Sequence, residues 1–290
     1  MIGELAAIGS AFTWAISSAI LRKVADEVPS LTLNALRSAA GTGMYALAII
    51  LTGRYVLFAG VSSRGWLFIV LNLCIGMVLG DTAYYSSMRL IGLSRALTIS
   101  SVYPLLTALL AGAFLGELFT WKTWAGFVLC IGGVILVARS EVRRGDPAPT
   151  RRLLRGTMMA IAAACMWAVG TICLRVGSEG LDALVVNSVR LAGVSLFAGL
   201  WARARGELAC VRRFSRAQVL PILLASLIGS FGGATLYVLG VQLAGASKAA
   251  VLASIAPLVG VPMSLLAGES VNAKLLAGVV AAVVGVMLVV

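Results

Sequence analysis

Long apolar runs separated by short polar breaks make up the chain from end to end. A run of about 20 apolar residues is the length that an α-helix needs to cross the hydrocarbon core of a bilayer. Turn and charge signals such as Asp26-Glu-Val-Pro-Ser30, Gly53-Arg54 and Arg203-Ala-Arg-Gly-Glu207 fill the breaks. The pattern predicts an all-α membrane protein with ten transmembrane helices, at residues 3–22, 30–52, 66–88, 96–115, 119–138, 155–174, 183–201, 218–241, 249–267 and 275–290.

The same pattern occurs twice along the chain. A shift of 153 positions aligns two copies of it, and a constant offset kept over about 100 residues indicates a duplicated unit. We therefore predict a first five-helix repeat at 1–140, a basic connecting loop at 141–154 and a second five-helix repeat at 155–290. The aligned pairs include Trp14 with Trp167, Asn34 with Asn187, Arg37 with Arg190, Tyr84 with Tyr237 and Pro104 with Pro257.

Five helices is an odd number, so the second repeat is expected to enter the membrane from the side opposite to the first. Inverted repeats of this kind are a known basis for alternating access around a site near the bilayer midplane. Prolines inside apolar helices free a backbone carbonyl, which hydrocarbon tolerates only where a neighbouring helix or a cavity satisfies it. We predict that Pro104 and Pro257 break or bend the fourth helix of each half near the midplane. Each of these helices also ends on a Gly-Glu pair, Gly116-Glu117 and Gly268-Glu269.

Composition narrows the class of protein. Hydrophobic residues make up 60% of the chain, charged residues only 12%, and the mean hydropathy is +1.02; the surface of a soluble domain needs about a quarter charged residues. The net charge of +12 comes from basic residues in the gaps between spans, without the interleaved aromatic residues of a single-strand nucleic-acid binder. We expect the lipid bilayer as a partner, no nucleic acid, and a monomer.

Several of these features together resemble one known family. They are the two five-helix halves, the Asn-Ala-Leu-Arg37 and Asn-Ser-Val-Arg190 stretches, the proline of each fourth helix with its Gly-Glu end, and the glycine-rich fifth helices. Over nearly the whole chain they resemble the EamA-type drug/metabolite transporter superfamily, and within it the bacterial amino-acid exporters. The resemblance implies a ten-helix secondary transporter in a bacterial inner membrane.

The basic residues also predict a sidedness. Most lysines and arginines in the gaps follow the odd-numbered spans, above all in the gaps near 139–155 and 203–216. Cytoplasmic loops carry the positive excess, so we expect both termini on the outer, periplasmic side. The family resemblance implies the opposite, with cytoplasmic termini; we follow the charge pattern because its two richest loops are short.

Two helices of each half carry polar and aromatic residues on one face. Ser10, Trp14, Ser17 and Ser18 share a face of the first helix, which Trp167 and Thr171 echo on the sixth. Both tryptophans lie halfway along their spans, away from the interfacial belt, which favours a cavity wall over close helix packing by small residues.

The third and eighth helices carry tyrosines beside Gly-x-x-x-Gly motifs that are typical of close packing. Asp81 is the one acid clearly inside a span, and its repeat partner is Ala234. We interpret it as a candidate for substrate-ammonium binding or proton coupling; the alternative is a neutral carboxyl bonded to a tyrosine or asparagine. Arg37 and Arg190 lie about two turns inside the second helix of each half. This position favours a snorkelling or structural role near an interface over ligand contact.

The sequence as a whole favours a secondary transporter that exports small amphipathic metabolites, amino acids above all, including aromatic or apolar ones. No P-loop is present, so the energy for transport must come from a gradient or from the substrate itself. Residues expected in the central cavity are Trp14, Ser17, Ser18, Asp81, Tyr84, Tyr85, Ser101, Tyr103, Trp167, Thr171, Tyr237 and Ser254.

Three alternatives remain open. A nucleotide-sugar carrier would favour paired basic residues on the cavity wall, and a drug or cation carrier would need deep carboxylates in both halves. An intramembrane enzyme is the remote alternative, because the chain has no histidine and a single deep acid. We expect no catalytic residues, no cofactor and, in the absence of histidine and of CxxC pairs, no metal site.

Overall fold

The computed structural model describes residues 1–115, 120–138, 150–253, 255–256, 259 and 272–289, and the elements within them are helices. Up to residue 138 these are α1 (Ile2–Arg22), α2 (Ser30–Thr52), η1 (Arg54–Gly60), α3 (Ser63–Leu71), η2 (Asn72–Asp81), α4 (Thr82–Ile91), α5 (Leu93–Ser100), α6 (Tyr103–Leu115) and α7 (Trp121–Ala138). From residue 150 they are α8 (Thr150–Gly177), α9 (Ala183–Ala204), η3 (Glu207–Arg213), α10 (Arg216–Ala225), η4 (Ser226–Gly233), α11 (Ala234–Ala244), α12 (Ala246–Ala253) and α14 (Ala273–Val289).

Seven helical segments in the described part of the chain are long and apolar enough to cross a membrane. They are Ile2–Arg22, Ser30–Thr52, Ser63–Ile91, Leu93–Phe114, Thr150–Gly177, Ala183–Ala204 and Arg216–Ala244. A shorter apolar helix covers Ala273–Gly285. The chain is thus an all-helical, multi-pass membrane protein, and the full set of ten spans stays a prediction.

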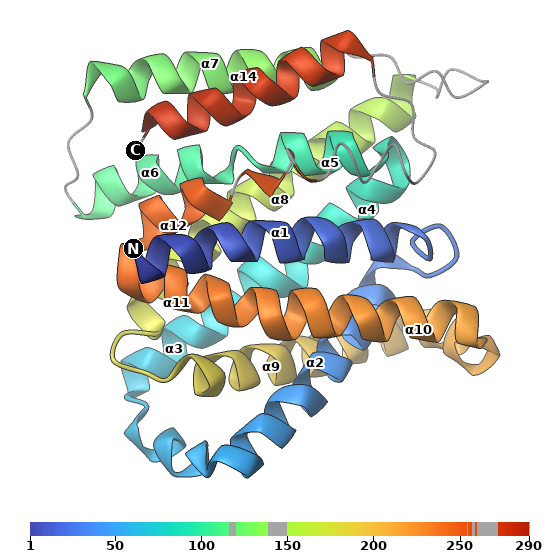
Figure 1. Ribbon diagram of the computed structural model, residues 1–290. Coiled ribbons are helices and arrows are strands. Elements are labelled where there is room, and N and C mark those ends of the chain that lie inside the picture. The colour runs from blue at the N-terminus through green and yellow to red at the C-terminus, as the bar shows by residue number, and fades with distance from the viewer. Residues whose placement is uncertain (116–119, 139–149, 254, 257–258, 260–271, 290) are drawn as a thin grey trace.

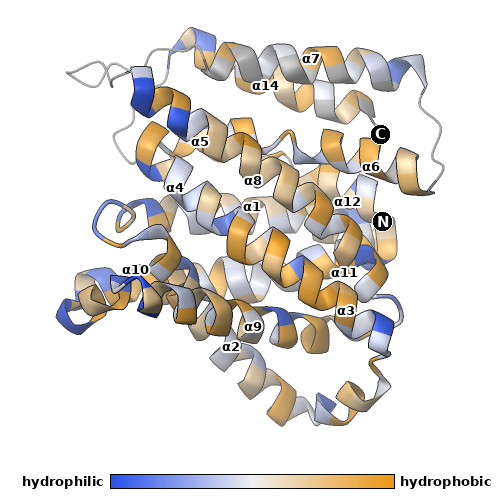
Figure 2. Ribbon diagram, turned by 180° about the vertical axis from the view of Figure 1, so that it is seen from behind, coloured by the Kyte–Doolittle hydropathy of each residue, from blue (hydrophilic) through white to orange (hydrophobic). Residues whose placement is uncertain are grey.

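The surface of the bundle matches this environment. Leucines and other large apolar side chains are exposed along α2, α9 and α10, for example Leu51 at 75% and Leu200 at 56%. Hydrophilic residues gather where α8 and α10 begin and where α1 turns into α2 (Figure 2). That end of the bundle is opposite to the N-terminus and to the last turn of α14 (Figure 1).

Helices of the first half pack against their counterparts in the second half. α2 lies against α9, and α7 lies against α14 on one side of the bundle (Figure 1). α1 crosses the second-half segment that contains η4 and α11, while α8 crosses the first-half segment that contains η2 and α4. The core of the molecule is therefore built where the two halves meet.

A π-helical stretch interrupts each of the segments Ser63–Ile91 and Arg216–Ala244. η2 and η4 are π-helices, and adding 153 to the numbers of η2 gives a range that contains all of η4. A π-helix inserts an extra residue into the turn and often marks a functional site. The periodicity of the sequence predicts regular α-helices in both segments, so the π-helices correct that prediction.

The fourth helix is broken next to Pro104. α5 ends at Ser100, the chain turns through Ser101 and Val102, and α6 begins at Tyr103. Pro104 is the second residue of α6, in the first turn, where a helix tolerates the missing N–H of proline. Pro257, Ser254 and both Gly-Glu pairs lie outside the described residues.

Candidate functional site

A cavity of about 140 Å³ lies between the two halves. Of the twelve side chains expected there, eleven lie in its wall, and Ser254 is outside the described residues. That they contact a substrate stays a prediction. The eleven are Trp14, Ser17, Ser18, Asp81, Tyr84, Tyr85, Ser101, Tyr103, Trp167, Thr171 and Tyr237.

Two aromatic pairs join the halves across this cavity. The rings of Trp14 and Tyr237 have centroids 4.8 Å apart, and those of Trp167 and Tyr84 are 5.3 Å apart. Each pair combines the tryptophan of one half with the tyrosine of the other, at matching positions of the repeat. Such tilted contacts suit the quadrupoles of the rings, so the same packing occurs twice.

Glycines of the π-helical segments make room for the two indoles. A Cβ atom on Gly80 would lie 2.9 Å from Cδ1 of Trp167, and one on Gly233 would lie 2.9 Å from Cδ1 of Trp14. Both distances are too short for a real side chain. The glycine motifs of the third and eighth helices are therefore close-packing positions, as the sequence predicted.

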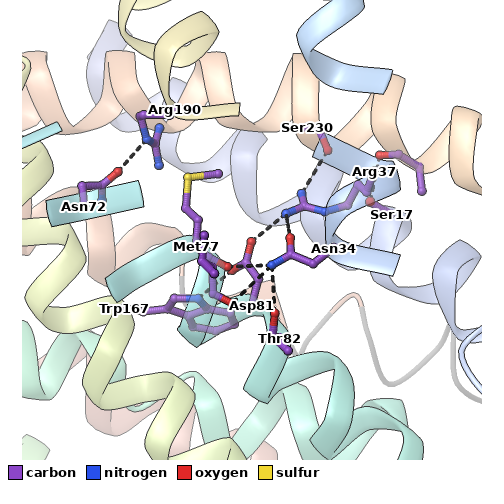
Figure 3. Close-up of polar contacts among 12 residues, drawn as sticks. Ser17, Asn34, Arg37, Asn72, Met77, Asp81, Thr82, Trp167, Arg190 and Ser230 are labelled. Atoms are coloured by element: carbon purple, nitrogen blue, oxygen red, sulfur yellow. Dashed lines mark hydrogen bonds and ion pairs between the residues drawn. The ribbon is translucent and has the colours of Figure 1, made fainter. Parts of the chain in front are cut away.

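Asp81 lies at the centre of a polar cluster contributed by both halves (Figure 3). Its Oδ2 accepts a hydrogen bond from Nη2 of Arg37 at 2.6 Å, which makes an ion pair, and its Oδ1 accepts from Nε1 of Trp167 at 2.8 Å. Nη1 of Arg37 also donates to the Ser230 hydroxyl at 3.0 Å. The carboxylate thus links α2, η2 and α8.

A second layer of contacts holds this cluster in place. Nδ2 of Asn34 donates to the backbone carbonyl of Met77 at 2.8 Å and to the Thr82 hydroxyl at 3.1 Å, while its Oδ1 accepts from Arg37 at 3.3 Å. The carbonyl of Met77 belongs to η2, so Asn34 satisfies a backbone group within the π-helix. The guanidinium of Arg37 packs over the Tyr85 ring, with 5.6 Å between Cζ of Arg37 and the ring centroid.

Arg190 occupies the matching position of α9 and lines the same cavity. Its Nε donates to Oδ1 of Asn72 at 2.7 Å, and its Nη1 donates to Oδ1 of Asn187 at 2.6 Å. Nδ2 of Asn72 donates in turn to the carbonyl of Gly170 at 2.7 Å. Within the described residues Arg190 makes no ion pair, because Ala234 stands where the first half has Asp81.

Sequence reasoning did not anticipate the position of the two arginines. Arg37 and Arg190 are each 6% exposed and line the cavity, so the snorkelling alternative is wrong, whereas the structural alternative fits Arg37, which pairs with Asp81. Asn34 and Asn72, which hold the arginines, were also missed as site residues. The repetition of Asn34 as Asn187, three residues before each arginine, was a usable signal because residues three apart share a helix face.

Other predicted residues bond within the wall. The hydroxyls of Thr171 and Tyr237 lie 2.9 Å apart, Ser17 donates to the carbonyl of Ala225 at 2.9 Å, and Tyr103 donates to the carbonyl of Ala250 at 3.1 Å. Tyr103 also meets the Trp167 ring edge to face. Ser17 and Tyr103 therefore bond across the interface between the halves, whereas Thr171 and Tyr237 bond each other within the second half.

Comparisons with known proteins agree with this architecture. The model of the EamA-like transporter family matches the chain twice, over residues 1–139 and 154–290. An uncharacterized transporter of Archaeoglobus fulgidus is 26% identical over 193 residues, which are 66% of this chain and 65% of that protein, so the chain matches less than two thirds of the relative's length. A solved crystal structure, described only as that of a protein, superposes with a TM-score of 0.69 at 17% identity, covering 99% of this chain and 94% of the other.

The crystal structure supports the fold alone, because its identity to this chain is low. The family model says more, since its two matches together cover almost all of the chain and their number suggests a repeat. This family consists of transporters and is not an enzyme family. The chain belongs to the EamA-like transporter family.

Proposed function

We propose that the chain is a secondary transporter that exports small amphipathic metabolites, amino acids above all, by alternating access around the central cavity. The observation that carries this proposal is that both halves of the chain contribute residues to the cavity wall. Trp14 and Asp81 come from the first half, and Trp167, Arg190 and Tyr237 come from the second. A site shared by two related bundles opens to either side when one bundle rocks against the other.

The chemistry of the wall supports a small solute with both polar and apolar parts. Aromatic faces from Trp14, Trp167 and Tyr84 provide an apolar surface, and hydroxyls and guanidinium groups provide polar contacts. A cavity of about 140 Å³ is close to the roughly 150 Å³ in which a protein interior can hold a benzene-sized body. This size favours single metabolites over bulky conjugates.

The rival carriers fit less well. Two arginines do line the cavity, as a nucleotide-sugar carrier would favour, but Asp81 neutralises one of them and the volume is small for a nucleotide. A drug or cation carrier would need a deep carboxylate in each half, and among the described lining residues Asp81 is matched by Ala234.

The arrangement in the membrane is part of the same proposal. We propose a monomer in a bacterial inner membrane, with ten spans, inverted repeats at 1–140 and 155–290, and the basic loop 141–154 between them. We also propose that both termini face the outside, supported by the opposite end of the bundle, which carries hydrophilic residues (Figure 2), among them the arginines at the start of α8 and α10. A reporter fused to the C-terminus and active only in the cytoplasm tests this, and a cytoplasmic signal contradicts it.

Uptake of labelled solutes into proteoliposomes tests the transport function. A panel of amino acids and nucleotide-sugars is compared in vesicles with the wild-type chain and in empty vesicles. We expect uptake of apolar or aromatic amino acids. Uptake of nucleotide-sugars alone overturns the substrate assignment.

Two wall variants extend the same assay. Trp167→Ala and Tyr84→Ala should lower uptake per molecule of folded protein, because both rings line the cavity. Trp167→Ala also loses the hydrogen bond to Asp81, so uptake is normalised to the folded protein recovered. Trp201→Ala is a matched control, since Trp201 is an exposed tryptophan on α9 outside the cavity wall. Full activity in both wall variants contradicts a role of the rings in solute contact.

A further inference from the structure

We propose that Arg190 is the receptor for a carboxylate of the transported solute, so that the substrates are small organic acids, amino acids included, with an apolar body. The inference rests on the proposed transport function, because the solute must enter this cavity. The amino group of an amino acid has a minor role in this recognition.

The hydrogen bonds of Arg190 leave one edge of its guanidinium open. The group carries five N–H donors, and the two contacts found in the described residues use one on Nε and one on Nη1. Nη2 has no hydrogen bond there, and the residue lines the cavity. The donors that remain are one on Nη1 and two on Nη2, and neighbouring guanidinium donors can bind a carboxylate through two parallel hydrogen bonds.

The charge of Arg190 is also uncompensated. Its acceptors are the amide oxygens of Asn72 and Asn187, which are neutral. Buried charges in proteins are normally paired, because an isolated ion in a medium of low polarity is costly. The described wall of the cavity contains Arg37, Arg190 and Asp81, so it has one positive charge in excess. A monoanionic group on the solute balances it.

Arg37, at the matching position of the first half, differs from Arg190 because it has an acidic partner and uses both Nη atoms in hydrogen bonds. Its two Nη atoms bond Asp81, Asn34 and Ser230, so the edge that would meet a ligand carboxylate is already occupied. Figure 3 shows Asp81 and Arg37 joined in one cluster and Arg190 apart from it, bonded to Asn72. The receptor is therefore on α9.

The neighbours of Arg190 suit the remainder of such a solute. Asn72 and Asn187 hold the guanidinium from two sides, and Asn72 is itself anchored on Gly170 of α8. The ring pair of Trp14 and Tyr237 lines the same cavity and gives an aromatic surface for an apolar body. A phenyl-sized body matches the cavity volume.

Three probes of one size separate the two charges of an amino acid. They are 3-phenylpropionate, which has only the carboxylate, phenethylamine, which has only the ammonium group, and phenylalanine, which has both. Binding to the full chain in detergent is followed by tryptophan fluorescence excited where the probes do not absorb, since Trp14 and Trp167 line the cavity. We expect 3-phenylpropionate and phenylalanine to bind, and phenethylamine to bind at least about tenfold more weakly.

Variants then assign the effect to Arg190. Arg190→Gln should weaken 3-phenylpropionate by about tenfold or more, and Arg190→Lys by less, because lysine keeps the charge and loses the fork. Arg203→Gln is the matched control: it makes the same change on the exposed end of α9, and binding should stay as in the wild type. Residual phenethylamine binding, equal in all variants, shows that the cavity is still formed.

The outcomes separate this inference from the proposed function. Equal binding of phenethylamine and 3-phenylpropionate overturns the receptor role of Arg190, even if amino acids are transported. Unchanged 3-phenylpropionate affinity in Arg190→Gln, or no binding of either carboxylate, also overturns it. Binding of 3-phenylpropionate that is lost in Arg190→Gln supports the inference, and if vesicles then take up no amino acid, only the amino-acid assignment fails.

Discussion

Arg37 and Arg190 stand at matching positions on α2 and α9, three residues after an asparagine, and each is 6% exposed. In the first half Asp81 pairs with the arginine at 2.6 Å. In the second half Ala234 replaces the acid, and the arginine bonds two neutral amides. The difference makes Arg37 a brace between helices, whereas Arg190 keeps free donors, for which we propose a ligand carboxylate.

The largest expected effect comes from removing the acid of the first site. Asp81→Ala leaves Arg37 buried without a counter-charge and takes an acceptor from Trp167. Breaking a buried ion pair on one side costs about 3–5 kcal/mol, so the free energy of unfolding in mixed micelles should fall by that amount. Glu179→Gln, at an exposed acid, is the control. Wild-type stability of Asp81→Ala would show that the pair is not a brace.

The two tryptophans should differ in the same way as the arginines. Trp167 donates from Nε1 to the Asp81 carboxylate at 2.8 Å, whereas no hydrogen bond from Trp14 is found among the described residues. A hydrogen bond to a charged group is worth about 1.5–3 kcal/mol. Trp167→Phe should therefore lower the free energy of unfolding by about that much more than Trp14→Phe. An equal loss of unfolding free energy in the two variants would mean that ring packing alone determines the contribution of each tryptophan.

The smallest expected effect is on ligand affinity. It comes from a substitution that gives the second half the acid of the first. Ala234→Asp places an acid where the repeat has Asp81, at a site that is 5% exposed and in the cavity wall. The new carboxylate should pair with Arg190 and weaken 3-phenylpropionate binding about tenfold, or ~1.4 kcal/mol. Ala234→Asn, of the same size and uncharged, is the comparison. Unchanged affinity in Ala234→Asp would argue that this position does not reach Arg190.

Much of the scaffold was predictable because helix periodicity is local. Residues such as Trp14, Ser17 and Ser18 share a helix face at any point of an α-helix, so a stripe of them indicated a wall before any packing was known. The matching offsets of Tyr84 and Tyr237 likewise indicated that a contact made once would be made twice. The aromatic pairs across the cavity agree with this.

The sequence by itself determined the helical membrane class, the duplicated pattern and the faces of α1 and α8 that turn inward, since these depend on spacing within single segments. Only the tertiary structure decided that Asp81 pairs with Arg37, 44 positions away, while Arg190 pairs with no acid in the described residues. It also decided that η2 and η4 are π-helices, where the sequence predicted regular α-helices. The physical reason is that a buried charge is satisfied by whatever the packing of distant segments brings beside it.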